Sequence, residues 1–221
     1  MSLALYDEGL RSPEVKISVR YADGRHEALA LDRWRGAVTV ADESMLIRAS
    51  GSVLDVGCGP GRLTAALAAR GADALGIDVA AAAVALTMEG GGRALQRSVF
   101  DALPGVGGWD TALLADGNIG IGGNPVRLLR RLGDLLTPRG QVLIELDPPG
   151  SGPAVRLQAR LETSCGRFGA WFGWAVVGVD SLPVLAAEAG LSVQEVWSAH
   201  EPGIGPRYFG AVGFEPHDVA A

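Results

Sequence analysis

Three glycines at alternate positions follow a short apolar run and precede a helix-like run. The mostly apolar residues 53–56, Val-Leu-Asp-Val, lead into Gly57, and Gly59 and Gly61 follow before Arg62 begins the helical pattern. A strand that ends in such a loop brings the backbone close to a ligand, and the next helix points its N-terminus at the same place. The pattern predicts a site for a nucleotide-type ligand at the carboxyl edge of a sheet.

An acidic residue supplies the second half of such a site. Asp78 ends the apolar run 74–77 and lies 21 positions after Gly57. In doubly wound folds a carboxylate at this place binds the hydroxyls of a ribose. A plain helix N-cap is the alternative interpretation, although one carboxylate can fulfil both roles.

The glycine spacing distinguishes two classes of nucleotide ligand. A dinucleotide site reads Gly-x-Gly-x-x-Gly, whereas here the third glycine comes one residue early and position 62 is Arg. Residues 55–61 instead resemble the first motif of the class I S-adenosylmethionine-dependent methyltransferases, acidic-x-Gly-x-Gly-x-Gly. The resemblance spans residues 40–215 and implies S-adenosylmethionine as cofactor, with S-adenosylhomocysteine as product.

The resemblance also implies cofactor contacts at neighbouring strand ends. Asp101 matches the acidic residue that accepts from the adenine amine, beside the aromatic face of Phe100; a turn cap before Pro104 is the alternative. The second glycine-rich segment, 115–123, would hold the amino-acid part of the cofactor or the substrate, or is simply a tight loop. The expected cofactor residues are Asp55, Gly57, Cys58, Gly59, Gly61, Asp78, Val79, Phe100, Asp101, Asp116 and Asn118.

The candidate catalytic residues are His200, near the end of a predicted strand, and Asp116. Methyl transfer from a sulfonium requires that the acceptor is held in line, that water is excluded and that a hydroxyl acceptor loses its proton. A surface position is the alternative for the histidine. Aromatic side chains are candidates for the acceptor wall, with ordinary packing of the hairpins as the alternative. The expected substrate-binding residues are Tyr6, Trp34, Asn118, Trp171, Phe172 and Trp174.

The segment 147–150, Asp-Pro-Pro-Gly, is similar to the Asn/Asp-Pro-Pro-aromatic motif of amino-methyltransferases, but it differs in two ways. It follows the fifth core strand rather than the fourth, and Gly150 replaces the stacking aromatic residue. Asp116, Asn118 and Asp147 could also bind magnesium. However, Pro148 stands where cation-dependent catechol methyltransferases have the Asn of an Asp-Asn pair, so we expect no metal.

Length, composition and charge narrow the function classes. The chain has 221 residues, 48% of them hydrophobic, which is enough for one sizeable core. A net charge of -6 argues against nucleic acid as a partner, and no apolar run is long enough to cross a membrane. No N-terminal signal is visible, and Cys58 and Cys165 are expected to be free thiols, so we expect a cytoplasmic protein.

The expected function is therefore methyl transfer to oxygen or nitrogen of a small-molecule acceptor. Two alternatives remain open at this point: an NAD(P)-dependent oxidoreductase, and a non-catalytic S-adenosylmethionine-binding regulatory or scaffold protein. The sequence leaves both a monomer and a homodimer open.

The elements that must position these residues alternate between strands and helices. We predict an α/β fold with a doubly wound, Rossmann-like sheet of seven mostly parallel strands and an antiparallel C-terminal strand. Alternating residues predict two β-hairpins, one at the N-terminus and one after the fifth core strand. The expected single domain, 1–221, divides into an N-terminal lid and hairpin segment (1–40), a cofactor-binding core (41–150), an inserted hairpin (151–178) and a C-terminal helix and strand pair (179–221).

Overall fold

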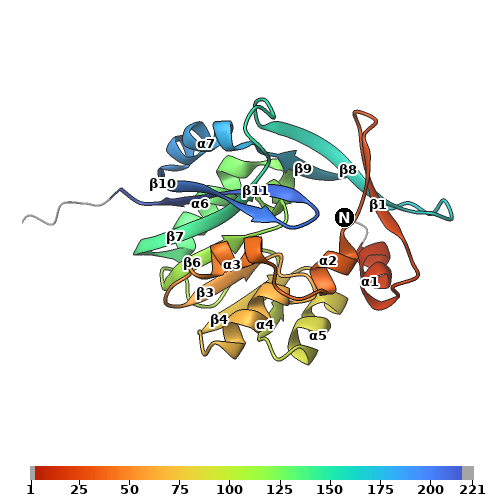
Figure 1. Cartoon of the computed structure of the whole chain (residues 1–221), viewed down its shortest axis with the longest axis horizontal. Helices are drawn as coiled ribbons and strands as arrows, with labels where there is room; N and C mark the ends of the chain where they lie inside the picture. The colour runs from red at the N-terminus through yellow and green to blue at the C-terminus, as the bar shows by residue number, and fades with distance from the viewer. Residues whose placement is uncertain (1–2, 216–221) are drawn as a thin grey trace, which may run out of the picture.

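Seven strands form the central sheet, here called sheet B, in the spatial order β10-β11-β7-β6-β3-β4-β5 (Figure 1). The computed structural model describes residues 3–215. Neighbouring strands are parallel except at β11, which runs antiparallel to β10 and β7. The predicted fold class is confirmed. The strands are β3 (Val53–Val56), β4 (Ala74–Asp78), β5 (Ala94–Gln96), β6 (Trp109–Leu114), β7 (Leu136–Leu146), β10 (Ser192–Glu201) and β11 (Gly205–Gly213).

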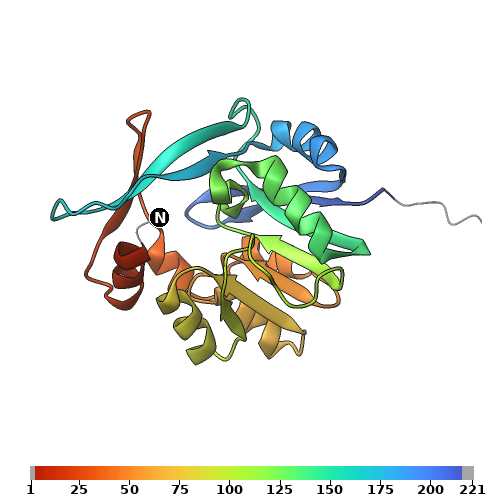
Figure 2. The ribbon, with the colours of Figure 1, turned by 180° about the vertical axis from the view of Figure 1, so that it is seen from behind.

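Helices cover both faces of sheet B. On one face, α3 (Val40–Leu46) and α4 (Arg62–Ala69) bury apolar side chains against β3, β6 and β11. On the other face lie α6 (Pro125–Leu135) and α7 (Leu182–Ala189), seen from behind in Figure 2. The apolar face of α6 follows helical spacing, and its leucines at 128, 129, 132 and 135 are fully buried. These two layers hold the strand ends, and therefore the loops after them, in fixed positions.

The two predicted hairpins join into one four-stranded sheet, here called sheet A, in the order β2-β1-β8-β9. The strand β1 (Ile17–Tyr21) pairs antiparallel with β8 (Val155–Thr163), so residues more than 130 positions apart lie side by side. The outer strands are β2 (His26–Ala28) and β9 (Phe172–Val176). Sheet A lies beyond the carboxyl ends of the parallel strands of sheet B, at the top right of Figure 1.

Two helices at the start of the chain complete the lid. The helix α1 (Leu3–Arg11), which the sequence analysis did not predict, packs Leu5 and Leu10 against the N-terminal end of α5 (Ala81–Glu89) and against sheet A. Helix α2 (Leu31–Arg35) follows the first hairpin. The remaining elements are the short 3₁₀ segments η1 (Asn118–Gly123) and η2 (Val179–Ser181).

The strand β5 ends at Gln96, because Ser98 donates its backbone N–H to the Asp101 carboxylate at 3.0 Å and the chain turns there. Within residues 3–215, no helix has both the length and the apolar character needed to cross a membrane. The division of the chain into four functional segments stays a prediction.

Candidate active site

The glycine loop follows β3 and places three residues in the left-handed region of backbone conformation. The φ angles of Gly57, Gly59 and Gly61 are +73°, +55° and +89°. A Cβ atom on Gly57 would lie 2.7 Å from the Asn118 side chain, and one on Gly61 would lie 2.6 Å from Thr87. Both the conformation and the close packing therefore require glycine at these positions.

Asp78, the last residue of β4, holds this loop in place. One of its carboxylate oxygens accepts the N–H of Gly59 at 3.0 Å, and the other accepts the N–H of Ala80 at 2.9 Å. Burial raises the pKa of the Asp78 carboxyl, although these backbone hydrogen bonds act in the opposite direction. Each carboxylate oxygen can accept a second hydrogen bond, and Asp78 lines the cavity described next, so it can bind ribose hydroxyls while it fixes the loop.

A cavity of about 710 Å³ lies between the carboxyl edge of sheet B and the inner face of sheet A. The ends of β3, β4 and β7 and the loop after β6 form one side, and α1, α2 and sheet A form the other. Ten of the predicted site residues meet here, from segments far apart in the chain. They are Tyr6, Trp34, Gly57, Asp78, Val79, Phe100, Asp116, Asn118, Phe172 and Trp174.

Four residues of the first motif support this site from behind without lining the cavity. Asp55 is buried and accepts a hydrogen bond from the Thr64 hydroxyl at 2.7 Å, which ties β3 to α4. Burial raises its pKa to about 6. Cys58 is a buried free thiol whose pKa burial raises strongly, so it is not a reactive thiolate. Gly59 and Gly61 act through the backbone geometry of the loop.

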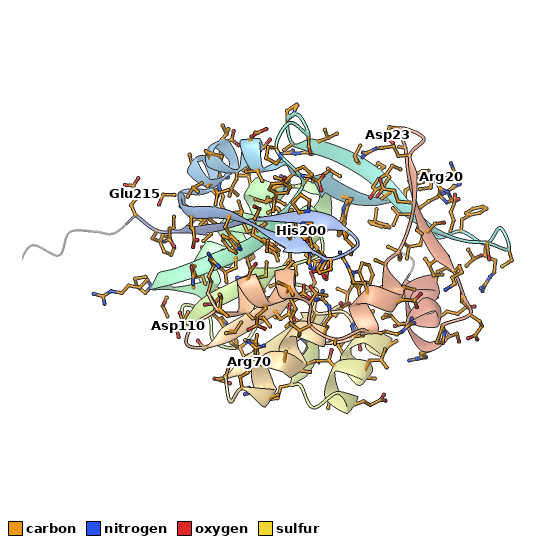
Figure 3. All side chains as sticks on the ribbon, in the orientation of Figure 1. Arg20, Asp23, Arg70, Asp110, His200 and Glu215 are labelled. Atoms are coloured by element: carbon orange, nitrogen blue, oxygen red, sulfur yellow. The ribbon has the colours of Figure 1, made fainter. Side chains whose placement is uncertain are left out.

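The structure does not bring three other predicted residues to the cavity. Asp101 is exposed and caps its own turn, the alternative considered from the sequence. Trp171 is 44% exposed, and the Arg160 guanidinium lies over its ring. His200 is exposed on β10, opposite Pro206 of β11, outside the cavity lining (Figure 3). Its sequence position near a strand end was misleading, because β10 is the outermost strand of sheet B.

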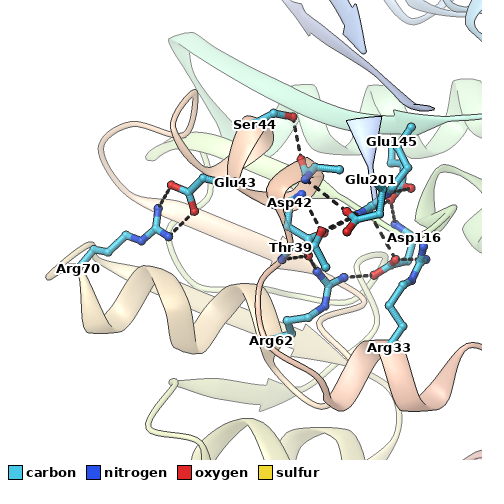
Figure 4. Close-up of polar contacts among 12 residues, drawn as sticks. Arg33, Thr39, Asp42, Glu43, Ser44, Arg62, Arg70, Asp116, Glu145 and Glu201 are labelled. Carbon is cyan, nitrogen blue, oxygen red and sulfur yellow. Dashed lines mark hydrogen bonds and ion pairs between the residues drawn. The ribbon is translucent and has the colours of Figure 1, made fainter. Parts of the chain in front are cut away.

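Asp116 lies at the centre of a network of ion pairs (Figure 4). It contacts Arg33 of the lid helix α2 and, at 2.7 Å, Arg62 of α4. Arg62 also pairs with Asp42 of α3, and these two side chains are only 4% and 1% exposed. Because two guanidinium groups engage the Asp116 carboxylate, its geometry fits positioning of the loop after β6 better than proton removal.

The sequence analysis did not identify the other half of this network. Arg207 of β11 donates to both carboxylate oxygens of Glu145 of β7, at 2.8 Å each, and to Asp42 at 2.9 Å. Glu145 in turn accepts the backbone N–H of Asp116 at 2.6 Å. No local motif marks these residues. The only signal was a charged residue within an otherwise apolar strand at each position.

Asn118 connects the second glycine-rich segment to the first. Its side-chain amide donates to the carbonyl oxygens of Val56 and Gly57, at 2.9 and 3.0 Å. Within residues 3–215, its amide oxygen accepts no hydrogen bond and is available at the cavity wall. The two loops thus form one rigid edge at the switch point of sheet B.

Comparison with known proteins agrees with this geometry. Residues 25–196 match the family described as methyltransferase domain. The chain belongs to this family. No curated protein sequence matches the methyltransferase at a significant level.

Solved structures share the fold. An S-adenosylmethionine-dependent methyltransferase from Bacteroides fragilis, in complex with S-adenosyl-L-homocysteine, has a TM-score of 0.74 and 22% identity over 96% of this chain and 93% of its own. The 1,6-didemethyltoxoflavin-N1-methyltransferase of Burkholderia thailandensis has a TM-score of 0.54 and 20% identity, covering 76% and 73%. The sugar N-methyltransferase KedS8 from Streptoalloteichus has a TM-score of 0.55 and 19% identity, covering 78% and 85%.

The residues of the methyltransferase fit S-adenosylmethionine as the cofactor. Gly57 lets the backbone approach a ligand, Asp78 can accept from ribose hydroxyls, and Val79 and Phe100 offer apolar surface for an adenine ring. The free amide oxygen of Asn118 can accept from the amino group of the methionine part. The nicotinamide-dependent oxidoreductase, the alternative left open by the sequence, is not supported by the family. Within the described residues, no group of three or more His, Cys, Asp or Glu side chains is arranged to hold a metal ion.

Proposed function

We propose that the methyltransferase transfers a methyl group from S-adenosylmethionine to an oxygen or nitrogen atom of a small molecule bound in the 710 Å³ cavity. When bound, the cofactor supplies a methyl group attached to a positively charged sulfur atom. After transfer of the methyl group, this sulfur is part of a neutral thioether. The residues of this chain bind the two reactants, align them and exclude water.

The observation that carries this proposal is the length of the cavity along the edge of sheet B. It extends from Asp78 at the end of β4 to Asp147 directly after β7, and these strands are separated by three strand spacings, or about 14 Å at about 4.8 Å each. The cofactor residues cluster near β3 and β4. The remaining space under sheet A is therefore available for an acceptor.

The lining of that space favours a small organic molecule. Aromatic side chains of Tyr21, Trp34, Phe172 and Trp174 enclose it, and the volume is in the range of ordinary small-molecule sites, about 300–1,000 Å³. Sheet A and the lid helices line one side of the site, an arrangement that suits a small acceptor better than a long polymer. Two proteins of similar fold act on small acceptors according to their names, the 1,6-didemethyltoxoflavin-N1-methyltransferase and the sugar N-methyltransferase KedS8.

The test is methyl transfer from S-adenosylmethionine labelled in its methyl group. Purified protein is incubated with a set of small amines, phenols and alcohols, and separately with bulk RNA and unfolded protein. The proposal expects label in at least one small molecule and none in the polymers. Label found only in RNA or protein would contradict it.

A further inference from the structure

Asp147 lines the cavity directly after β7, three strand positions away from Asp78 at the end of β4. It follows β7, and its backbone is fixed because its N–H donates to Val177 at 2.9 Å and its carbonyl accepts from Val179 at 3.1 Å. Its side chain lines the cavity. The backbone is held on both sides, and the exposed side chain carries its negative charge at this end of the cavity.

A second carboxylate faces the same space from the opposite wall. Glu27 of β2 is paired in register with Val19 of β1, and cross-strand partners point to the same face of a sheet. Tyr21, two residues after Val19, is also on that face. All three side chains line the cavity, so Glu27 and Tyr21 belong to the wall that faces Asp147.

These two carboxylates are exposed, and they differ from the other acidic groups of the cavity. Glu145 is paired with Arg207, Asp116 with Arg33 and Arg62, and Asp78 with backbone N–H groups. Within residues 3–215, neither Asp147 nor Glu27 has a hydrogen-bond or ion-pair partner for its side chain. Burial and the negative charge of Glu27 raise the pKa of Asp147, while Arg25 opposes this effect.

The cation nearest to the pair is already engaged. Arg25 contacts Asp23 at 2.9 Å and lies over the ring of Tyr21. The acceptor end therefore has an excess of negative charge beside aromatic surface. A cationic ligand would compensate that charge, whereas a carboxylate or phenolate would be repelled.

We propose that the acceptor is an amine, and that Asp147 and Glu27 bind its ammonium form beside the ring of Tyr21. This inference rests on the proposed function and narrows it to N-methylation. The aromatic side chains next to the two carboxylates favour an amine with an apolar or aromatic body.

The reaction balances without an added reagent. The ammonium gives one proton to the Asp147 carboxylate, which frees the nitrogen lone pair. A nitrogen–carbon bond to the methyl group forms while the carbon–sulfur bond breaks, and the electron pair of that bond stays on sulfur. The product is a methylated ammonium ion, and Asp147 returns its proton to solvent.

The test compares matched amines and alcohols: benzylamine with benzyl alcohol, and cyclohexylamine with cyclohexanol. Labelled methyl transfer is measured together with calorimetric binding of each compound to protein saturated with S-adenosylhomocysteine. We expect transfer to and binding of an amine, at least tenfold better than its alcohol. In Asp147→Asn and Glu27→Gln we expect amine affinity to fall at least tenfold, with S-adenosylhomocysteine affinity unchanged within twofold.

Two further readouts separate recognition from general damage. Asp73→Asn is the control. Asp73 is exposed and directly precedes β4, at the opposite end of the strand from Asp78, so this variant should leave amine binding unchanged. In the wild type, kcat/KM for the amine should fall at acid pH as Asp147 is protonated beside Glu27, Arg25, Glu145 and Tyr21, and Asp147→Asn should lack this fall.

Alcohols methylated as well as amines, or amine binding unchanged in Asp147→Asn, would overturn the inference while leaving the proposed function intact. If amines bind through Asp147 but no compound is methylated, the proposed function fails and the ammonium site stands. If neither amines nor alcohols bind, both the site and the acceptor role are wrong.

Discussion

Arg207 and Glu145 form a bidentate pair between two neighbouring strands of sheet B, with Nε and Nη2 of the arginine each 2.8 Å from a carboxylate oxygen. The pair is nearly inaccessible, with side chains 5% and 13% exposed. Burial alone would raise the pKa of Glu145, but the hydrogen bonds from Arg207 outweigh it and lower the pKa. The pair lies directly under Asp116 and anchors the loop after β6.

Removal of one partner of this pair should therefore destabilise the folded protein. We expect Arg207→Met to lower the free energy of unfolding by about 3–5 kcal/mol, because it leaves Glu145 buried without its ion-pair partner and leaves Asp42 with Arg62 alone. Urea denaturation followed by circular dichroism measures this change. Arg93→Met is the control: it breaks an exposed pair with Asp73 and should cost less than about 1 kcal/mol. Equal losses in both variants would mean that the buried network is not a stabilising element.

Replacement of Gly57 should lower the affinity for the cofactor more than it lowers the stability of the fold. In Gly57→Ala the new Cβ meets the Asn118 amide, which shifts the two loops that face the cavity. We expect the affinity for S-adenosylhomocysteine to fall at least tenfold. Gly71→Ala is matched in φ, at +78°, but its Cβ would meet nothing within 4 Å, so only backbone strain remains. Calorimetric titration of both variants tests this, and normal binding in Gly57→Ala would contradict the packing argument.

The raised pKa of Asp55 makes stability depend on pH. The folded state favours the protonated carboxyl, so ionisation of Asp55 lowers the free energy of unfolding. This loss is absent below the ordinary pKa of about 4, grows as the pH rises toward about 6, and is complete above that value. Asp55→Asn can still accept from Thr64 and cannot ionise. Its unfolding free energy relative to wild type should therefore rise between pH 4 and pH 7, by up to about 2–3 kcal/mol at about 1.36 kcal/mol per pKa unit.

Denaturation at several pH values measures this difference. Asp134→Asn, an exposed position on α6, serves as the control and should show no comparable trend. A difference between Asp55→Asn and wild type that does not change with pH would show that Asp55 is already protonated, or not desolvated, throughout the range.

The lid depends on a contact between α1 and α5. Asp7 accepts the backbone N–H of Ala82 at 2.8 Å, in the first turn of α5. Loss of such a cap costs about 1 kcal/mol. We expect Asp7→Ala to speed amide exchange across residues 3–11 and to lower the affinity for the acceptor, because Tyr6 lies on the same helix. Hydrogen exchange by mass spectrometry tests this. Glu14→Ala, which removes an exposed carboxylate outside the helix, should leave exchange unchanged; the same increase in both would refute the contact's role.

Local sequence signals were sufficient for the core of the fold and for the residues of the glycine loop and β4 that line the cavity. The three glycines, the strand before them and Asp78 are all encoded within a short segment, and their positions follow from strand and loop geometry. Strand alternation likewise predicted both hairpins. What it could not predict is that Val19 pairs with Leu161, because pairing between distant strands leaves no local pattern.

The same limit applies to predicted site residues that the structure places differently from what their sequence positions suggested. Asp101 fits a family position, but the turn that it caps directs its carboxylate to Ser98. His200 was placed by its position near a strand end, without knowledge that β10 is the outer strand. Asp116 was expected to be available for catalysis, whereas Arg33, which comes 83 residues earlier in the chain, engages it. For His200 and Asp116 the deciding neighbour is fixed by tertiary packing, whereas the turn that engages Asp101 is local.

The identity of the cofactor is tested most directly by calorimetric titration of the wild-type protein with S-adenosylmethionine, S-adenosylhomocysteine, NADH and NADPH. We expect both sulfur compounds to bind in the micromolar range, with one site per chain, and neither nicotinamide compound to bind. Binding of NADH or NADPH, with no binding of either sulfur compound, would contradict the assignment of the glycine loop and Asp78 to S-adenosylmethionine.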